Sequence, residues 1–374
     1  MSQEDTKFEL AKLRKLFPIT DTKTYLMNAA LSPLNANGRR AMDEYLDLSQ
    51  TDVIARPDVR QNVKSLLSQL LGGKSDDYAL TTSTGHGMSM VAAGLEVGAG
   101  DNIVLAAGEH WNATFPWLNL KSKGVEVRVV QPDENNRVGP NAFMELCDEK
   151  TRAICVTAVR FDTGFRYDLK ALSELAHEHD ALLIVDGTQC AGANDLNVVR
   201  DGVDVLAGAG FKWLLGMAGT GYLYVNEEAR RLIRSTAPGM YAAEKDFEKI
   251  TYYDDARRYE TGTIANLLFH GWSKGLELLL DYGIGNVVRR NRKLTDLLIA
   301  GLGHKNVEIV SPHASYLERS AIVAFLVSDP SAQAQLNEKL LAANVLISTR
   351  GDTIRVSPNF FNTEVEIEKF LHCI

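Results

Sequence analysis

The sequence alternates short apolar runs with amphipathic stretches between about residues 60 and 225. The runs have the length of β-strands, and the stretches between them repeat apolar residues at helical spacing, as Leu169, Leu172 and Leu175 do. This alternation is typical of a mostly parallel sheet with helices on both faces, whose ligands bind beyond the carboxyl ends of the strands. The pattern predicts strands over 101–106, 125–130, 153–159, 181–185, 203–206 and 222–225, and helices over 87–95, 117–123, 140–147 and 169–177.

The last third of the chain has a different pattern. A long helical periodicity runs from about Leu267 to Leu302 and is interrupted near Gly283 and Gly285. The residues after this periodicity predict a smaller α+β unit. Its expected elements are a strand over 320–327, a helix over 332–342, a hairpin of 345–348 with 353–356, and a final helix over 364–372.

Length, charge and cysteine usage limit the class of protein. The 374 residues suggest about two domains. The 40 basic and 48 acidic side chains leave a net charge of −8, which disfavours nucleic-acid binding. No apolar run reaches the ~18–20 residues that span a bilayer, so we expect no membrane segment. Met1–Phe8 lacks a secretory pattern, and the four cysteines form no C-x-x-C pair, so we expect reduced thiols and a cytoplasmic location.

Several short motifs fail on inspection. Gly72–Ser75 resembles the end of a P-loop, but Ser68 stands where that motif needs a glycine. Gly216–Gly221 has the wrong glycine spacing for a dinucleotide-binding fingerprint, which disfavours a nucleotide-dependent α/β enzyme. His177 and His179 end a predicted helix, where the helix dipole favours histidine, so no metal site is expected.

Two segments together indicate a specific chemistry. Asp186 ends an apolar strand, at the edge where ligands bind, although a turn or capping role is an open alternative. Lys212 has apolar neighbours; a partly desolvated lysine can form a Schiff base, unless it extends to water. A Schiff-base lysine and a carboxylate for a pyridinium nitrogen are what pyridoxal 5′-phosphate (PLP) requires.

Further segments carry a resemblance to a known family: 25–30, 83–86, 109–117, 185–189, 210–213, 219–221, 258–263 and 355–360. In this order they make the chain similar, from about Tyr25 to Leu371, to the class V aminotransferases. This branch of the fold-type I PLP-dependent enzymes includes cysteine desulfurases and isopenicillin N epimerase-like proteins.

The resemblance implies an α/β fold of the aspartate aminotransferase type. A large domain with a mostly parallel seven-stranded sheet is expected beside a smaller α+β C-terminal domain. The implied division is an N-terminal segment (1–19), a PLP-binding domain (20–265), a connecting helix (266–284) and a small domain (285–374). A homodimer with its active site at the interface is also implied.

The resemblance further implies roles around the cofactor ring. Lys212 corresponds to the lysine that forms the internal aldimine and moves the Cα proton. Asp186 corresponds to the partner of the pyridine nitrogen, and Gln189 to a residue near the ring hydroxyl. Trp111 stands where relatives stack an aromatic ring or a histidine on the cofactor, with core packing as the alternative.

Other positions correspond to residues that bind the phosphate or the substrate. Thr84, Gly85 and His86 open a predicted helix, whose amide groups can bind the cofactor phosphate, and Thr263 corresponds to a residue contributed by the second subunit. For the substrate, the implied residues are Arg355, which binds the α-carboxylate unless it forms a surface salt bridge, and Asn28, Ala29 and Ala30 at the entrance.

The sequence also departs from the family pattern. Cysteine desulfurases carry a nucleophilic cysteine just before the arginine; Ile347–Ile354 has none and Cys373 is close to the C-terminus, so persulfide-forming desulfuration is not expected. Phe161, Phe211 and Ala209 stand where relatives have Asn, His and Ser.

The expected function is therefore that of a PLP-dependent enzyme acting at Cα or Cβ of a small amino acid. Aminotransferase or Cβ–S lyase chemistry is favoured. An epimerase and a non-catalytic PLP-fold binding protein are the alternatives. Arg160 and Arg166 flank Phe161 and are candidates for contact with a distal acidic group of the substrate.

Overall fold

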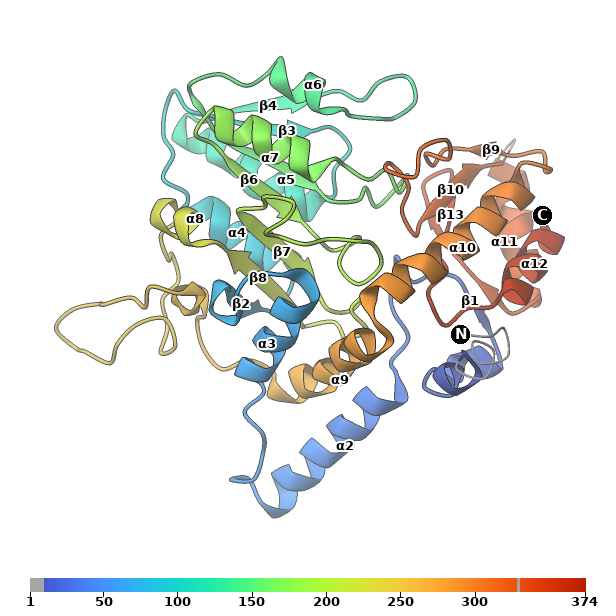
Figure 1. Cartoon of the computed structure of the whole chain (residues 1–374), viewed down its shortest axis with the longest axis horizontal. Helices are drawn as coiled ribbons and strands as arrows, with labels where there is room; N and C mark the ends of the chain where they lie inside the picture. The colour runs from blue at the N-terminus through green and yellow to red at the C-terminus, as the bar shows by residue number, and fades with distance from the viewer. Residues whose placement is uncertain (1–9, 328–329) are drawn as a thin grey trace.

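The computed structural model describes residues 10–327 and 330–374, and a seven-stranded sheet forms its centre (Figure 1). The strand order is β2-β8-β7-β6-β5-β3-β4. β8 is antiparallel to β2 and β7, whereas β3 to β7 pair in parallel, so most strands end at one edge. The strands are β2 (Tyr78–Thr81), β3 (Asn102–Ala106), β4 (Glu126–Val130), β5 (Thr151–Thr157), β6 (Leu182–Asp186), β7 (Val205–Ala209) and β8 (Gly221–Val225).

Helices cover both faces of this sheet, and the strands are apolar on both sides for that reason. Along β3, Val104 belongs to one core, whereas Ile103 and Leu105 belong to the other. The first core includes residues of α3 (Arg60–Leu71) and α7 (Leu169–Glu178), and the second includes residues of α4 (Thr84–Gly94) and α5 (Trp111–Leu118). The other short helices of this part are α6 (Pro140–Met144), α8 (Glu227–Leu232) and the 3₁₀ turns Ser75–Asp77, Asn119–Lys123 and Ala256–Tyr259.

A second, smaller sheet lies beside α10, which continues from α9 away from the large sheet (Figure 1). Gly283, with φ +84°, separates α9 (Asn266–Tyr282) from α10 (Ile284–Leu302), as the sequence predicts. This sheet has the order β12-β13-β10-β9 and packs on α10. Its elements are β9 (Glu308–Ile309), β10 (Val323–Leu326), β12 (Ser348–Arg350) and β13 (Thr353–Val356), with α11 (Pro330–Ala342) and α12 (Glu364–Cys373) beside them.

The predicted hairpin of 345–348 with 353–356 is wrong in its first strand. β11 (Val345–Leu346) pairs instead with β1 (Thr24–Tyr25), and the hairpin is formed by β12 and β13. The N-terminal part is thereby attached to the small sheet before it continues through α2 (Ala36–Thr51), which packs on α9.

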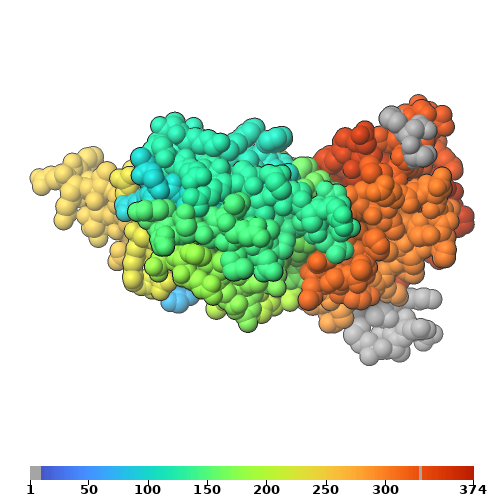
Figure 2. All heavy atoms as spheres, turned by 90° about the horizontal axis from the view of Figure 1, so that it is seen from above, coloured from blue at the N-terminus to red at the C-terminus, as the bar shows by residue number. Residues whose placement is uncertain are grey.

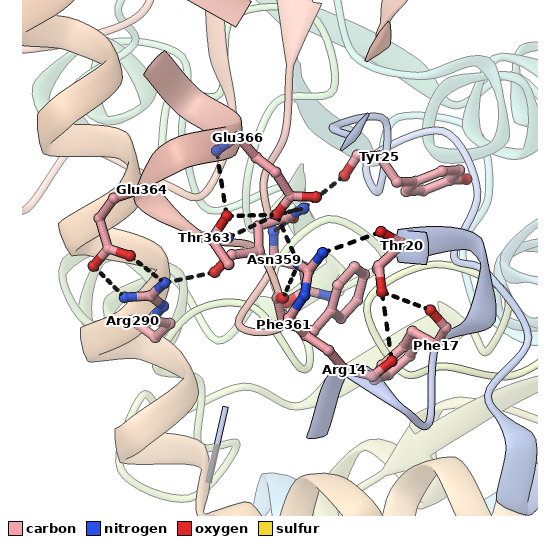
Figure 3. A network of polar contacts seen from close by, with 11 residues as sticks. Arg14, Phe17, Thr20, Tyr25, Arg290, Asn359, Phe361, Thr363, Glu364 and Glu366 are labelled. Carbon is pink, nitrogen blue, oxygen red and sulfur yellow. Dashed lines mark hydrogen bonds and ion pairs between the residues drawn. The ribbon is translucent and has the colours of Figure 1, made fainter. Parts of the chain in front are cut away.

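A polar network fixes this attachment (Figure 3). The Arg14 guanidinium donates to the Phe361 carbonyl and to the Glu366 carboxylate, and it also donates to the carbonyl of Thr20 in the 3₁₀ turn Pro18–Asp21. Because Glu366 lies on α12, the two ends of the described chain are held together. The proposed domain boundaries stay predictions, and Met1–Phe8 lies outside the described residues.

Two further features concern the surface. A loop over 234–255 projects from the body next to the large sheet (Figures 1 and 2), and its Phe247 side chain is fully exposed. Among residues 10–327 and 330–374, no helix combines the length and the apolar character needed to cross a bilayer.

Candidate active site

A pocket lies where the parallel strands of the large sheet end. Thr157 of β5, Asp186 of β6 and Ala209 of β7 line it side by side, and Lys212 follows β7 by three residues. The pocket therefore lies at the edge that the strand pattern predicts.

The loop that carries Lys212 is held from several sides. Gly216 donates its amide to the Gly210 carbonyl at 2.8 Å, and Leu215 donates to the Lys212 carbonyl at 3.0 Å. A Cβ atom at Gly210 would come within 2.3 Å of Thr220 Oγ1, so this position needs glycine. The Trp272 indole donates to the Leu214 carbonyl from α9. The lysine is therefore presented by a fixed turn.

The surroundings of Lys212 favour its neutral amine. Burial lowers the pKa of Lys212 to about 8; the positive charges of Arg355 and Arg350 act in the same direction, whereas the Asp186 carboxylate opposes them. A neutral amine can act as a nucleophile and as a base, so this lysine is prepared for both.

Asp186 is buried at the floor of the same pocket. One of its carboxylate oxygens accepts a hydrogen bond from the Thr188 amide at 2.8 Å. The Thr188 hydroxyl in turn bonds the Thr84 hydroxyl at 2.6 Å. This chain of contacts ties the carboxylate to the start of α4.

The first turn of α4 opens at the pocket. Ser83 caps the helix by accepting from the His86 amide, and Ser83 and Thr84 line the pocket. Amide groups in a first helical turn have no partner inside the helix and attract anions. Gly85 lines an adjoining depression with Asn112 instead, and the His86 ring turns back to the Thr82 hydroxyl at 3.2 Å.

Gln189 connects the pocket to the N-terminal segment. Its amide nitrogen donates to the Ala29 carbonyl, and its oxygen accepts from the Trp213 indole, both at 2.9 Å. The buried Asn28 donates to the Ser357 carbonyl, which follows β13. Ala29 is buried and Ala30 half-buried, so the segment 28–30 joins the large sheet to the small one beside the pocket.

Arg355 on β13 is fully buried. Its Nε donates to Ser348 Oγ at 3.1 Å, and its Nη1 donates to the carbonyl of Phe161, a residue that lines the pocket. Its Nη2 has no hydrogen-bond partner within the described residues. Burial and the charge of Arg350 lower the pKa of Arg355, so an incoming anion would relieve an unfavourable environment.

The structure does not bring Trp111 or Thr263 into this pocket. The Trp111 side chain is 62% exposed and stacks on Phe115 outside it. Thr263 is exposed and does not line the pocket.

His110, which sequence analysis missed, lines the pocket in place of Trp111. It caps α5 and therefore sits at the sheet edge, one residue earlier than the position we selected. Burial and the charges of Lys212, Arg350 and Arg355 lower the pKa of His110, although Asp186 opposes them. The signal available in the sequence was that His110 lies in the short connection between β3 and α5, at the end of a parallel strand.

Glu109 was also missed. It is buried behind the pocket wall, where its carboxylate accepts from Thr157 Oγ1 at 2.6 Å. Burial raises the pKa of Glu109 to about 7, although the Thr157 hydroxyl and the Arg160 charge oppose this shift.

Phe161, Phe211 and Ala209 all line the pocket, so the departures from the family pattern lie at the site itself. The suggestion that Arg160 contacts a distal group of the substrate is wrong. Arg160 is buried and paired with Asp162. Arg166 points elsewhere and donates to the Asp195 carbonyl, because its loop turns away from the pocket.

The residues present fit pyridoxal phosphate. One pocket at the sheet edge is lined by Lys212, whose pKa is lowered, by the buried carboxylate of Asp186, and by Ser83 and Thr84 at the start of α4. These groups match the aldehyde, the pyridine nitrogen and the phosphate of the cofactor. Fold and site together define the class of PLP-dependent α/β enzymes.

Comparisons with known proteins identify the family. The model of the family described as aminotransferase class-V matches residues 24–370. A probable cysteine desulfurase of Methanothermobacter thermautotrophicus is 26% identical, with 95% of each chain covered. An uncharacterized aminotransferase of Bacillus subtilis is 25% identical, over 95% of this chain and 94% of the relative.

Solved structures agree on the fold. An apo cysteine desulfurase from Thermococcus onnurineus superposes with a TM-score of 0.87 at 23% identity, over 97% of this chain and 96% of that one. A complex between a cystine C–S lyase and its reaction product cysteine persulfide superposes with a TM-score of 0.88 at 22% identity, over 95% and 98%.

The chain therefore belongs to the class V aminotransferase family, and its cofactor is pyridoxal 5′-phosphate. The expectation that it is not a persulfide-forming cysteine desulfurase is overturned, because relatives and structural neighbours across nearly its whole length carry that name. That expectation rested on the absence of a cysteine from Ile347–Ile354 and on the position of Cys373 close to the C-terminus.

Proposed function

We propose that this protein cleaves the Cβ–S bond of a sulfur-containing amino acid, cysteine or its disulfide cystine. The observation that carries the proposal is that Lys212 and Asp186 line one pocket with Phe161, whose carbonyl accepts from the buried Arg355. The Arg355 Nη2 has no hydrogen-bond partner among the residues that the structure describes. Such a guanidinium suits the α-carboxylate that every amino acid carries.

The names of the relatives support the choice of bond. Several are cysteine desulfurases, and one structural neighbour is a cystine C–S lyase whose product is cysteine persulfide. Breaking the Cβ–S bond releases sulfide from cysteine or cysteine persulfide from cystine. The remaining carbons and nitrogen leave, after addition of water, as pyruvate and ammonia. When an acceptor thiol takes the sulfur of cysteine, the product is alanine.

The residues have separable tasks in this proposal. Bound pyridoxal phosphate supplies an electron sink for the bonds at Cα. Arg355 binds the substrate carboxylate, and the Lys212 amine takes the proton from Cα and later returns it. Asp186 keeps a proton on the pyridine nitrogen, and Ser83, Thr84 and the first amides of α4 bind the phosphate.

Product analysis tests the proposal. Protein loaded with PLP is incubated with L-cysteine, L-cystine or L-alanine, with Lys212→Ala as the control. Sulfide or persulfide, accompanied by pyruvate or alanine, is expected from the sulfur amino acids and not from the control. A keto acid without sulfur release would indicate transamination, and loss of chirality alone would indicate epimerisation. Either result contradicts the proposal, as does an absence of turnover.

We also propose that the active form is a homodimer located in the cytoplasm. Two observations support the dimer: Thr263 is exposed outside the pocket, and the stacked pair Trp111 and Phe115 leaves a large apolar surface in water. The four cysteines are free, which suits a reducing compartment.

A further inference from the structure

The segment after β5 turns back on itself next to the pocket. Val159 and Arg166 form a bridge, and Arg160 donates its amide to the Phe165 carbonyl at 2.8 Å. Gly164 donates to the Arg160 carbonyl at 3.1 Å. We name residues 159–166 the β5 turn. Its Phe161 lines the pocket.

One buried side chain secures this turn. Arg160 is 4% exposed, and its Nε and Nη2 donate to the two carboxylate oxygens of Asp162 at 3.1 and 2.7 Å. Its Nη1 donates to the Ala107 carbonyl, beyond the end of β3, at 2.9 Å. The guanidinium therefore holds the β5 turn in shape and also attaches it to the neighbouring strand.

The turn that follows β3 makes room for this arrangement. Gly108 has φ +75°, and a Cβ atom there would lie 2.5 Å from Arg160 Nη2. A side chain at this position would be strained and would displace the guanidinium. Glycine at 108 and arginine at 160 are thus matched to each other.

The β5 turn also contacts Arg355. The Phe161 carbonyl accepts from Arg355 Nη1, and Ser348 Oγ accepts from its Nε. With these two nitrogens fixed, the direction of Nη2, which has no hydrogen-bond partner in the described part of the chain, is fixed too. The Phe161 ring packs edge-on against His110, with 5.2 Å between ring centroids, so the pocket wall depends on the same turn.

We propose that Arg160 is a positioning residue for substrate carboxylate recognition: it fixes the Phe161 carbonyl, which orients the Arg355 guanidinium. The proposal rests on the proposed function only in that Arg355 binds the carboxylate of an amino acid. A planar fork with several donors is required, because a lysine cannot reach both Asp162 oxygens and the Ala107 carbonyl with fixed geometry.

The test compares two amines that differ by a carboxylate. Glycine and methylamine are titrated into PLP-loaded protein, and their apparent dissociation constants are read from the cofactor absorbance. The ratio of the two constants measures carboxylate recognition alone. The variants are Arg160→Met, Arg160→Lys and Asp162→Asn, with Arg355→Met for complete loss. Arg166→Met is the matched control from the same turn, since that side chain contacts Asp195 outside the pocket.

A second readout needs no cofactor. Hydrogen–deuterium exchange of the peptide covering 159–166 is followed in cofactor-free protein. Arg160→Met is expected to speed this exchange at least tenfold, whereas Arg166→Met leaves it within twofold of wild type. In the same variants, the preference for glycine is expected to fall at least tenfold with Arg160→Met, partly with Arg160→Lys and Asp162→Asn, and not with Arg166→Met.

The outcomes separate this proposal from the proposed function. Wild type that prefers glycine but cleaves no C–S bond contradicts the proposed function alone. Arg160→Met with the wild-type preference and exchange overturns the positioning role. If Arg160→Met does not fold, Arg160→Lys and Asp162→Asn decide in the same way. Wild type without a preference for glycine contradicts both proposals.

Discussion

The surroundings of Lys212 in the pocket change the pKa of its amine. Burial and two arginine charges favour the neutral amine of Lys212, and the Asp186 carboxylate works against them. The balance leaves a minority of these amines neutral near physiological pH, which is still far more than for a lysine in water. A lysine in water would be protonated almost completely there.

The titration of Lys212 can be measured in cofactor-free protein. Acetylation of this lysine is expected to reach half its maximal rate near pH 8, because the neutral amine reacts. In the urea-unfolded chain the midpoint should move to about 10.4. Asp186→Asn is expected to lower the folded midpoint further, since it removes the charge that favours the ammonium. Equal midpoints in folded and unfolded protein, measured by mass spectrometry, would contradict this environment.

Asp186→Asn also separates catalysis from folding. Asparagine keeps an oxygen that accepts from the Thr188 amide, so the urea midpoint should stay near that of wild type. The turnover number should fall by about 100-fold, because the neutral side chain no longer stabilises a protonated pyridine nitrogen. Turnover near the wild-type value would show that another group holds that nitrogen.

Among single residues, the sequence allowed prediction of those whose position follows from the end of a strand. It did not allow prediction of those whose orientation depends on the conformation of a turn. Asp186 ends β6 and Lys212 follows β7, so their position at the pocket was predictable, and their roles stay predictions. His110 and Trp111 are adjacent in sequence, and only the start of α5 determines which one faces the pocket. Arg160 could not be assigned, because its partner Ala107 lies on a different strand connection.

Among the elements, α12 shows how the N-terminal segment is anchored. Thr363 and Glu366 form a capping box at its start, and the Glu366 carboxylate also accepts from Arg14 and Asn362 (Figure 3). The Glu366 carboxylate therefore completes the capping box of α12 and also bonds Arg14, which precedes β1.

Glu366→Ala is expected to lower the free energy of unfolding by about 2 kcal/mol, because it removes the cap and leaves Arg14 without its ion pair. Val365→Ala is the control, since Val365 on the same helix is 69% exposed. Urea unfolding of both variants provides the measurement. Equal midpoints for the two would show that the network adds nothing to stability.

The end of α7 carries a pH-dependent contact. His177 Nε2 lies 2.9 Å from an Asp204 carboxylate oxygen, and this hydrogen bond raises the pKa of His177. Its contribution to stability is therefore complete below the unfolded pKa of about 6.5 and is lost as pH rises through the folded value. His177→Gln should destabilise the protein more at pH 5.5 than at pH 9. An equal effect at both pH values would contradict a charged contact.

Most elements were predictable because their apolar periodicity is local. β5, β6 and α7 lie close to their predicted ranges. β2 was not predicted separately, and β11 was assigned to the wrong partner, because its pairing with β1 joins residues more than three hundred positions apart. Pairing at such a distance leaves no local pattern.

At the scale of the whole molecule, the two sheets meet beside one pocket. The end of the large sheet supplies Lys212 and Asp186 to the pocket lining, and Arg355 of the small sheet bonds the carbonyl of Phe161, which also lines it. The segment 28–30 bonds Gln189 on one side and Ser357 on the other, so it couples the two. Site geometry therefore depends on how the sheets are held.

The proposed dimer can be tested by its mass in solution and by its effect on PLP binding. Light scattering should give twice the 41.2 kDa of the chain. Thr263→Ala should raise the dissociation constant of PLP about tenfold, because a hydrogen bond to a charged phosphate is lost across the interface. Thr261→Ala, an exposed neighbour, is the control. A monomer that retains PLP equally in both variants would contradict this arrangement.

The most direct test concerns the bond between the chain and its cofactor. PLP-loaded protein is reduced with borohydride, digested, and analysed by mass spectrometry. We predict a phosphopyridoxyl group on the peptide that contains Lys212, and none in Lys212→Ala. A tag on another lysine, or no tag on any peptide, would contradict the account.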